Sequence, residues 1–136
     1  MSVELMKHHG AFSWNELMTN DVEGAKAFYG ELLGWTTEDM TTDCGSYTMA
    51  NAGDKAVAGI MATPPQAEGT PPMWGAYVTV DDVDAMPGQI EKLGGKVLMP
   101  PQDIPDVGRF LVLQDPQGAL LMLITYSGEC ISNTKV

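Results

Sequence analysis

The stretch Arg109-Phe-Leu-Val-Leu-Gln-Asp-Pro-Gln-Gly-Ala-Leu-Leu-Met-Leu-Ile124 decides how the rest of the chain is interpreted. Two apolar runs, residues 110–113 and 119–124, flank the sequence Asp-Pro-Gln-Gly. Proline pre-sets the first dihedral of a turn, aspartate bonds the turn backbone, and glycine permits the exit geometry. The pattern predicts a β-hairpin. Its second strand is too apolar to have a solvated face, so it is either buried on both sides or lines an apolar cavity.

The remaining chain gives the same order of elements twice. In the first half, alternation and helical spacing predict a strand at 11–19, a helix at 22–33, and strands at 35–42, 47–51 and 56–62. In the second half they predict a strand at 73–80, a helix from about 84 to 93, a strand at 96–99, a loop at 100–108 and the hairpin. Shifted by 61 residues, Asp21-Val22 falls on Asp82-Val83 and Gly34 on Gly95. We therefore predict a repeated β-α-β-β-β unit.

These elements predict one domain over residues 10–126. A first module spans about 10–62, a proline-rich connector spans 63–72, and a second module spans about 73–126. Residues 1–9 are predicted to form a loose leader, and residues 127–136 a polar tail.

Composition excludes several classes of function. The 136 residues carry a net charge of -11, which is unsuited to binding nucleic acid. No apolar run is long enough to span a membrane, and the charged N-terminus does not resemble a signal peptide. We therefore expect a cytoplasmic protein in which Cys44 and Cys130 are free thiols.

Four motifs together resemble one known family. They are Asp21-Val-Glu-Gly-Ala-Lys-Ala-Phe-Tyr-Gly-Glu-Leu-Leu-Gly-Trp35, the entry to the second helix at 80–83, Leu93-Gly-Gly-Lys-Val97, and Gly108-Arg-Phe followed by Asp115-Pro-Gln-Gly118. They are similar to the glyoxalase, bleomycin-resistance and dioxygenase superfamily, which has the vicinal oxygen chelate fold. The resemblance implies an α+β protein in which two βαβββ modules form a curved mixed sheet around a cleft. It also implies a homodimer, and in the metalloenzymes one divalent metal in the cleft.

The resemblance places the metal ligands at four positions, and here none of them carries a suitable donor. The residues are Trp14, Gly59, Gly75 and Met122. Neither glycine, tryptophan nor methionine offers the hard oxygen or imidazole that Zn, Mg, Mn or Ni requires. We therefore expect no metal at the family position and no other cofactor. The adjacent His8 and His9 would point to opposite faces of a strand and are interpreted as an exposed pair.

Strand alternation predicts which other side chains share the face of these four positions. It adds Phe12, Glu16 and Met18 in the first strand, Tyr77 and Thr79 in the fifth, Leu120 and Ile124 in the last, and Val57 and Met61 in the fourth. Glu16 and Tyr77 are equivalent under the shift of 61 residues, so the repeat predicts that they lie near one another. The resulting surface is apolar and rich in methionine, with one carboxylate and one phenol, a composition typical of a small-molecule pocket.

Several alternatives remain open from the sequence. The same apolar residues could fill a closed core, since methionine packs irregular gaps well. Glu16 is either a solvated carboxylate at a strand end or a desolvated acid–base group. Arg109 either clamps an anionic ligand or pairs with Asp103 or Asp106.

The sequence thus predicts a metal-free member of the family that binds a small apolar or cationic molecule. The predicted ligand contacts are Trp14, Glu16, Met18, Gly59, Met61, Gly75, Tyr77, Leu120, Met122 and Arg109. A metal-free enzyme that uses Glu16 and Tyr77 as catalytic residues is one alternative. A metal-dependent lyase, isomerase or dioxygenase of the glyoxalase type is another, and a purely structural interaction protein is a third.

Overall fold

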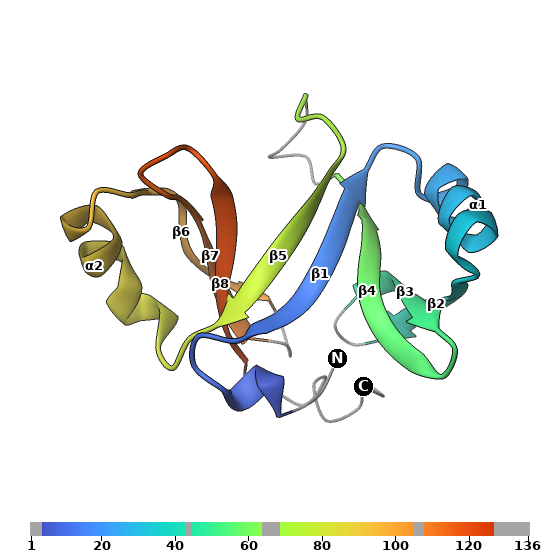
Figure 1. Ribbon diagram of the computed structural model, residues 1–136, viewed down its shortest axis with the longest axis horizontal. Helices are drawn as coiled ribbons and strands as arrows, with labels where there is room; N and C mark the ends of the chain where they lie inside the picture. Colours follow the sequence, from blue (N-terminus) through green and yellow to red (C-terminus); the bar gives the residue numbers. More distant parts are fainter. Residues whose placement is uncertain (1–3, 43–44, 64–68, 105–107, 127–136) are drawn as a thin grey trace.

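A computed structural model describes residues 4–42, 45–63, 69–104 and 108–126. Its eight strands form a single curved, mixed sheet in the order β2-β3-β4-β1-β5-β8-β7-β6 (Figure 1). The predicted α+β fold of two βαβββ modules is confirmed.

The first module follows the predicted order closely. Its elements are β1 (Phe12–Thr19), α1 (Val22–Leu33), β2 (Thr36–Thr42), β3 (Gly45–Ala52) and β4 (Lys55–Ala62). Asp21 caps α1 by accepting a hydrogen bond from the backbone N–H of Gly24, and the helix ends at Gly34 with a φ of 73°. Both ends are set by local chemistry, because aspartate supplies an acceptor for the first turn and glycine tolerates the left-handed conformation.

The second module repeats this order with one difference from prediction. Its elements are β5 (Met73–Thr79), a 3-10 turn (Val83–Ala85), α2 (Met86–Lys92), β6 (Lys96–Ile104), β7 (Gly108–Gln114) and β8 (Leu120–Tyr126). The predicted hairpin is confirmed, with Leu111 opposite Leu123. Residues 100–104, predicted as the start of the loop at 100–108, are instead part of β6. Proline is tolerated in β6 because this strand lies at the sheet edge and its pairing with β7 is irregular between Met99 and Gln102.

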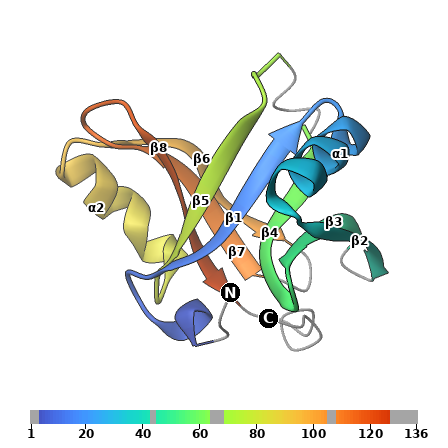
Figure 2. The same cartoon turned by 45° about the vertical axis from the view of Figure 1, so that its right-hand side comes forward.

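The two modules meet along β1 and β5, which run antiparallel in the middle of the sheet. On either side, β4 pairs with β1 and β8 pairs with β5 in parallel. Both helices lie on the same, outer face of the sheet, one over each module (Figures 1 and 2). We call the opposite face the inner face.

A separate apolar cluster lies beneath each helix. Leu17, Ala50, Ala58 and Ile60 are buried under α1. Val80, Val83, Ile90, Leu111 and Leu123 are buried beside α2. Because each helix has its own core on the outer face, the inner face is left to other side chains.

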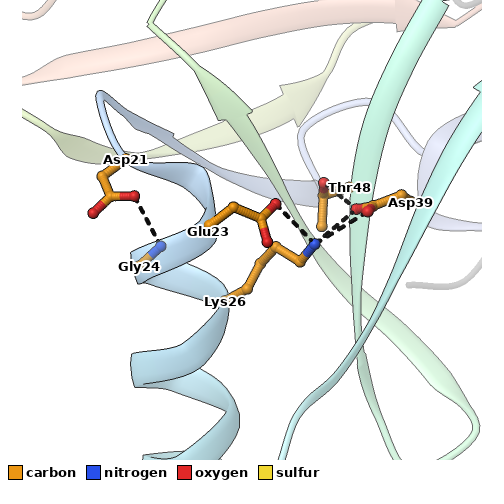
Figure 3. Close-up of polar contacts among 6 residues, drawn as sticks. All are labelled: Asp21, Glu23, Gly24, Lys26, Asp39 and Thr48. Carbon is orange, nitrogen blue, oxygen red and sulfur yellow. Dashed lines mark hydrogen bonds and ion pairs between the residues drawn. The ribbon is translucent and has the colours of Figure 1, made fainter.

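Polar contacts also hold α1 to the strands beneath it. The Lys26 ammonium contacts Glu23 at 3.2 Å and Asp39 of β2 at 3.1 Å, and the Thr48 hydroxyl of β3 donates to Asp39 at 2.8 Å (Figure 3). These bonds raise the pKa of Lys26 and lower the pKa of Asp39. The network ties one helix to two neighbouring strands, so we interpret it as structural.

Residues 1–9 were expected to form a loose leader, but the described part, from residue 4 onward, makes defined contacts. Leu5–Lys7 form a 3-10 turn with Met6 buried. The Thr79 hydroxyl donates to the carbonyl oxygen of Leu5, and His9 Nδ1 accepts from the backbone N–H of Asp81. This turn therefore packs against the end of β5. The predicted polar tail, Cys44, Cys130 and residues 64–68 of the connector lie outside the described residues.

Candidate functional site

Glu16 is the centre of a hydrogen-bond network on the inner face. Its two carboxylate oxygens accept from the hydroxyl of Tyr47 at 2.8 Å and from the hydroxyl of Tyr77 at 3.0 Å. The Tyr47 oxygen also accepts from Trp14 Nε1 at 2.9 Å. The four side chains come from β1, β3 and β5, so both modules contribute to the network. The sequence prediction that Glu16 and Tyr77 lie together is confirmed.

Burial changes the acid–base properties of this network. Loss of solvent raises the pKa of Glu16, and the hydrogen bonds from Tyr47 and Tyr77 oppose that effect. Burial, followed by the nearby charge of Glu16, raises the pKa of both tyrosines above the ordinary range. The phenols therefore stay protonated and donate, while the carboxyl group can bind or release a proton. Of the two alternatives for Glu16, these effects support the desolvated one.

The glycines at two of the four expected ligand positions make room for larger side chains. A Cβ atom added to Gly59 would overlap the hydroxyl end of the Tyr47 ring, and one added to Gly75 would overlap the terminal methyl of Met122. Gly59 and Gly75 are the partners of Glu16 on either side in the sheet. Tyr47 and Met122 thus occupy the space over both glycines, next to the carboxylate.

Apolar side chains surround the network. Tyr77, Met122 and Ile124 form a buried cluster with Trp14, Phe110, Val112 and Tyr126 packed against it. At one edge the hydroxyls of Ser13 and Tyr126 are 2.8 Å apart and hydrogen-bonded. Around the Glu16 carboxylate, this part of the inner face therefore carries apolar side chains and the phenols of Tyr47, Tyr77 and Tyr126.

Two residues predicted for the inner face lie on the outer one, and both predictions were wrong because of β-bulges. Phe12 stands opposite Val78, which packs against the core beside α2, and Phe12 is 60% exposed. Val57 packs against the core beneath α1. The pairing shifts between Phe12 and Trp14, and again beside Val57. An extra residue in one strand reverses the alternation beyond it.

Arg109 does not join the inner-face network. Its guanidinium donates to Asp84 at 2.9 Å and to Asp103 at 3.0 Å, which raises its pKa. Pairing with Asp103 was one of the predicted alternatives, whereas Asp84 was not foreseen and Asp106 lies outside the described residues. Leu120, also a predicted contact, is 44% exposed near the turn of the hairpin.

Sequence reasoning missed Tyr47, which bridges Trp14 and Glu16. The strand that contains Tyr47 has no clear alternation of apolar and polar residues, so the sequence did not indicate which face this side chain occupies. The signal that could have found it is Gly59, because a glycine within an otherwise apolar strand marks a close approach of other atoms.

No group of three histidine, cysteine, aspartate or glutamate side chains suited to a metal occurs among the described residues. None of the helices in that part of the chain is long and apolar enough to cross a membrane.

Comparison with known proteins decides the family. The model of the glyoxalase/bleomycin resistance protein/dioxygenase superfamily matches residues 8–123. The chain belongs to this superfamily. Within it, a Mycobacterium tuberculosis protein named as a glyoxylase, CFP32, is 44% identical over 117 residues. The anthracycline biosynthesis protein DnrV of Streptomyces peucetius is 34% identical over 123 residues.

Both relatives are longer than this chain. The matches cover 84% and 81% of the chain but only 45% of each relative. The chain thus spans about half the length of these two members of the superfamily.

Solved structures share the fold at low sequence identity. Methylmalonyl-CoA epimerase from Mycobacterium tuberculosis has a TM-score of 0.59 at 16% identity, and the match covers 92% of both chains. The Mn(II)-bound glyoxalase from Novosphingobium aromaticivorans has a TM-score of 0.54 at 17% identity, covering 87% of this chain and 40% of that one. These likenesses establish the arrangement of the two modules.

Proposed function

We propose that this protein binds a small, largely apolar organic molecule, neutral or cationic, against the inner face of its sheet, without a metal at the family position. The observation that carries the proposal is the buried Glu16 carboxyl group, held by Tyr47 and Tyr77 and surrounded by aromatic and methionine side chains. Trp14, Met18, Gly59, Met61, Gly75, Tyr77, Leu120 and Met122 are its proposed contacts.

Charge and polarity support this class of ligand. A carboxyl group in apolar surroundings favours a cation or a hydrogen-bond donor and disfavours a phosphorylated compound. Arg109, the only arginine and an obvious anion-binding group, is already paired with two carboxylates. Buried apolar area contributes about 25 cal/mol per Å², which is sufficient for micromolar affinity without a metal. We therefore retain Arg109 only as a peripheral contact.

The relatives suggest one compound for a first test. DnrV is named for anthracycline biosynthesis. Thermal shifts with an anthracycline, neutral polycyclic compounds, apolar amines and phosphorylated compounds would compare the relevant classes. We expect Trp14→Ala to abolish stabilisation by any ligand that binds, and Glu16→Gln to weaken the amines specifically.

Phe12→Ala is the matched control, because it removes an aromatic ring from the same strand but from the outer face. It should leave ligand binding unchanged. If no compound class stabilises the protein, or if binding is indifferent to Trp14, the proposal is wrong.

A second candidate is a metal-free enzyme in which Glu16 transfers a proton and Tyr77 holds the substrate oxygen. The raised pKa of Glu16 favours it, because a carboxylate that holds a proton more strongly is a better base and can return that proton afterwards. Exchange of the carbon-bound proton next to a ketone with D2O, followed by NMR, tests this reaction. Exchange that requires Glu16 and persists in EDTA would identify an enzyme.

We also propose that two copies of the chain associate through the exposed side of α1. Phe28, Leu32 and Leu33 are 59%, 63% and 53% exposed there, next to the ring pair formed by Tyr29 and Trp74. An exposed patch of this kind is typical of an interface, and the superfamily resemblance makes a second copy the expected partner.

Light scattering at micromolar concentration tests the association. Leu32→Glu should give monomers. Leu93→Glu, at the equivalent exposed position of the second module, should leave the dimer intact. A monomeric wild-type protein would remove this proposal and leave the ligand proposal untouched.

A further inference from the structure

Three methionines form a row across the middle of the sheet. Met18 of β1 stands directly opposite Met61 of β4 on one side and Met73 of β5 on the other. Directly opposed residues in neighbouring strands share a face. Met18 follows Glu16 by two residues, so the row lies on the inner face, one step beyond the carboxylate. From this register we infer that Met18, Met61 and Met73 form a binding site for a soft monovalent cation of the Cu(I) class.

The spacing of the row suits a shared ion. Neighbouring strands are about 4.7–4.9 Å apart. With the zinc–sulfur bond length of about 2.3 Å as a guide, two sulfurs on one ion lie about 4–4.6 Å apart. Met61 and Met73 start two strand spacings apart, on either side of Met18, and the three rotatable side-chain bonds of methionine allow both sulfurs to lean toward the sulfur of Met18. All three residues are half-buried, which leaves the row accessible to an ion.

The donor set decides which ion would bind. Thioethers are neutral and polarisable, and they select Cu(I) over Zn, Mg or Mn. The strong negative charge of the chain favours the approach of any cation. This site differs from the superfamily position in its residues, its donor atoms and its metal.

A buried hydroxyl group lies at the same end of the inner face. Thr63 follows Met61 by two residues, and its backbone N–H donates to the carbonyl oxygen of Thr19, which continues the ladder of β1 and β4. Among the described residues, its buried hydroxyl oxygen has no hydrogen-bond partner. By alternation this oxygen belongs to the face of the methionine row, where it offers a polar atom to a bound ion or its water.

Silver(I) is a suitable probe because it is soft and does not change oxidation state during the experiment. We would titrate the full chain carrying Cys44→Ser and Cys130→Ser, which removes competing thiols, and follow the ten methionine methyl groups by NMR. The signals of Met18, Met61 and Met73 should shift together and saturate at one equivalent. Cu(I) under argon should compete for the same site, and Zn(II) should leave the three signals unmoved.

Single changes of these residues to leucine preserve volume, so the fold should tolerate them. Each should weaken Ag(I) binding at least tenfold, and the triple variant should lose it. Met86→Leu on α2, at the outer face, is the matched control and should have no effect. Three methyl signals that stay in place with two equivalents of Ag(I) would overturn the inference, and so would undiminished binding in the triple variant. The first readout needs no change to the three methionines, so it stands even where a methionine substitution disturbs folding.

Discussion

Glu16 and Tyr47, 31 residues apart in the chain, are joined on the inner face by a hydrogen bond of 2.8 Å. The bond exists because Gly59, the partner of Glu16 in the neighbouring strand, has no side chain to exclude the tyrosine ring. The position of the Tyr47 ring therefore depends on the absence of a side chain at Gly59. At this position the fold holds a phenol beside a carboxylate.

The first prediction concerns stability against pH. Glu16 has a raised pKa in the folded protein, so between the ordinary glutamate pKa of about 4.3 and that raised value the folded state binds more protons than the unfolded state. The contribution of Glu16 is thus fully present below that window and is lost as pH rises through it. Urea unfolding from pH 4 to 8 should show a decline that Glu16→Gln removes. An identical decline in that variant would contradict the prediction.

The second prediction concerns the effect of the Tyr47 hydroxyl on the pKa of Glu16. Tyr47→Phe removes a hydrogen bond that lowers the pKa of Glu16, so the carboxyl pKa should rise further. It also leaves Trp14 Nε1 without its acceptor. Carbon-13 NMR of the glutamate carboxyl groups measures the titration. Tyr29→Phe, on the outer face, is the control and should leave the Glu16 titration unchanged.

The third prediction compares the two inner-face glycines. Gly59→Ala should destabilise the protein by about 1–3 kcal/mol, because the Tyr47 ring must leave its place and its two hydrogen bonds. Gly75→Ala should cost less, since only the flexible end of Met122 has to move. In a Tyr47→Ala background, Gly59→Ala should add little. Equal costs with and without the tyrosine ring would show that the crowding lies elsewhere.

The fourth prediction tests the hydrogen bonds that join β8 to the segment between β5 and α2. The Thr125 hydroxyl of β8 donates to the carbonyl oxygen of Val80 and accepts from the backbone N–H of Val83. Thr125→Val keeps the shape but leaves both backbone groups unpaired, so the free energy of unfolding should fall by about 1–3 kcal/mol. Thr125→Ser keeps the hydroxyl and should lose much less. Chemical denaturation of the three proteins gives the comparison.

The fifth prediction is that Zn, Ni, Mn and Fe do not occupy the superfamily position. Two of its four places are glycines, and the space over them is taken by Tyr47 and Met122. Elemental analysis of the purified protein should find none of these metals near one per chain, and EDTA should leave the melting temperature unchanged. A stoichiometric metal that persists after both His8 and His9 are changed to alanine would defeat the prediction.

The sequence by itself determined the order of elements, the helix limits at Asp21 and Gly34, and the hairpin around Asp115-Pro-Gln-Gly118. These features depend on neighbours in the chain: caps, turn dihedrals and the periodicity of apolar residues. The repeat also placed Glu16 near Tyr77, because equivalent residues of two modules meet about the axis between β1 and β5.

The tertiary structure alone decided which residues share a face beyond each bulge, since one inserted residue moves Phe12 and Val57 to the other side of the sheet. It also decided that Tyr47 fills the space above Gly59 and that Arg109 pairs with Asp84, 25 residues away. Such contacts depend on the shape of a folded surface, and no local pattern in the chain encodes that shape.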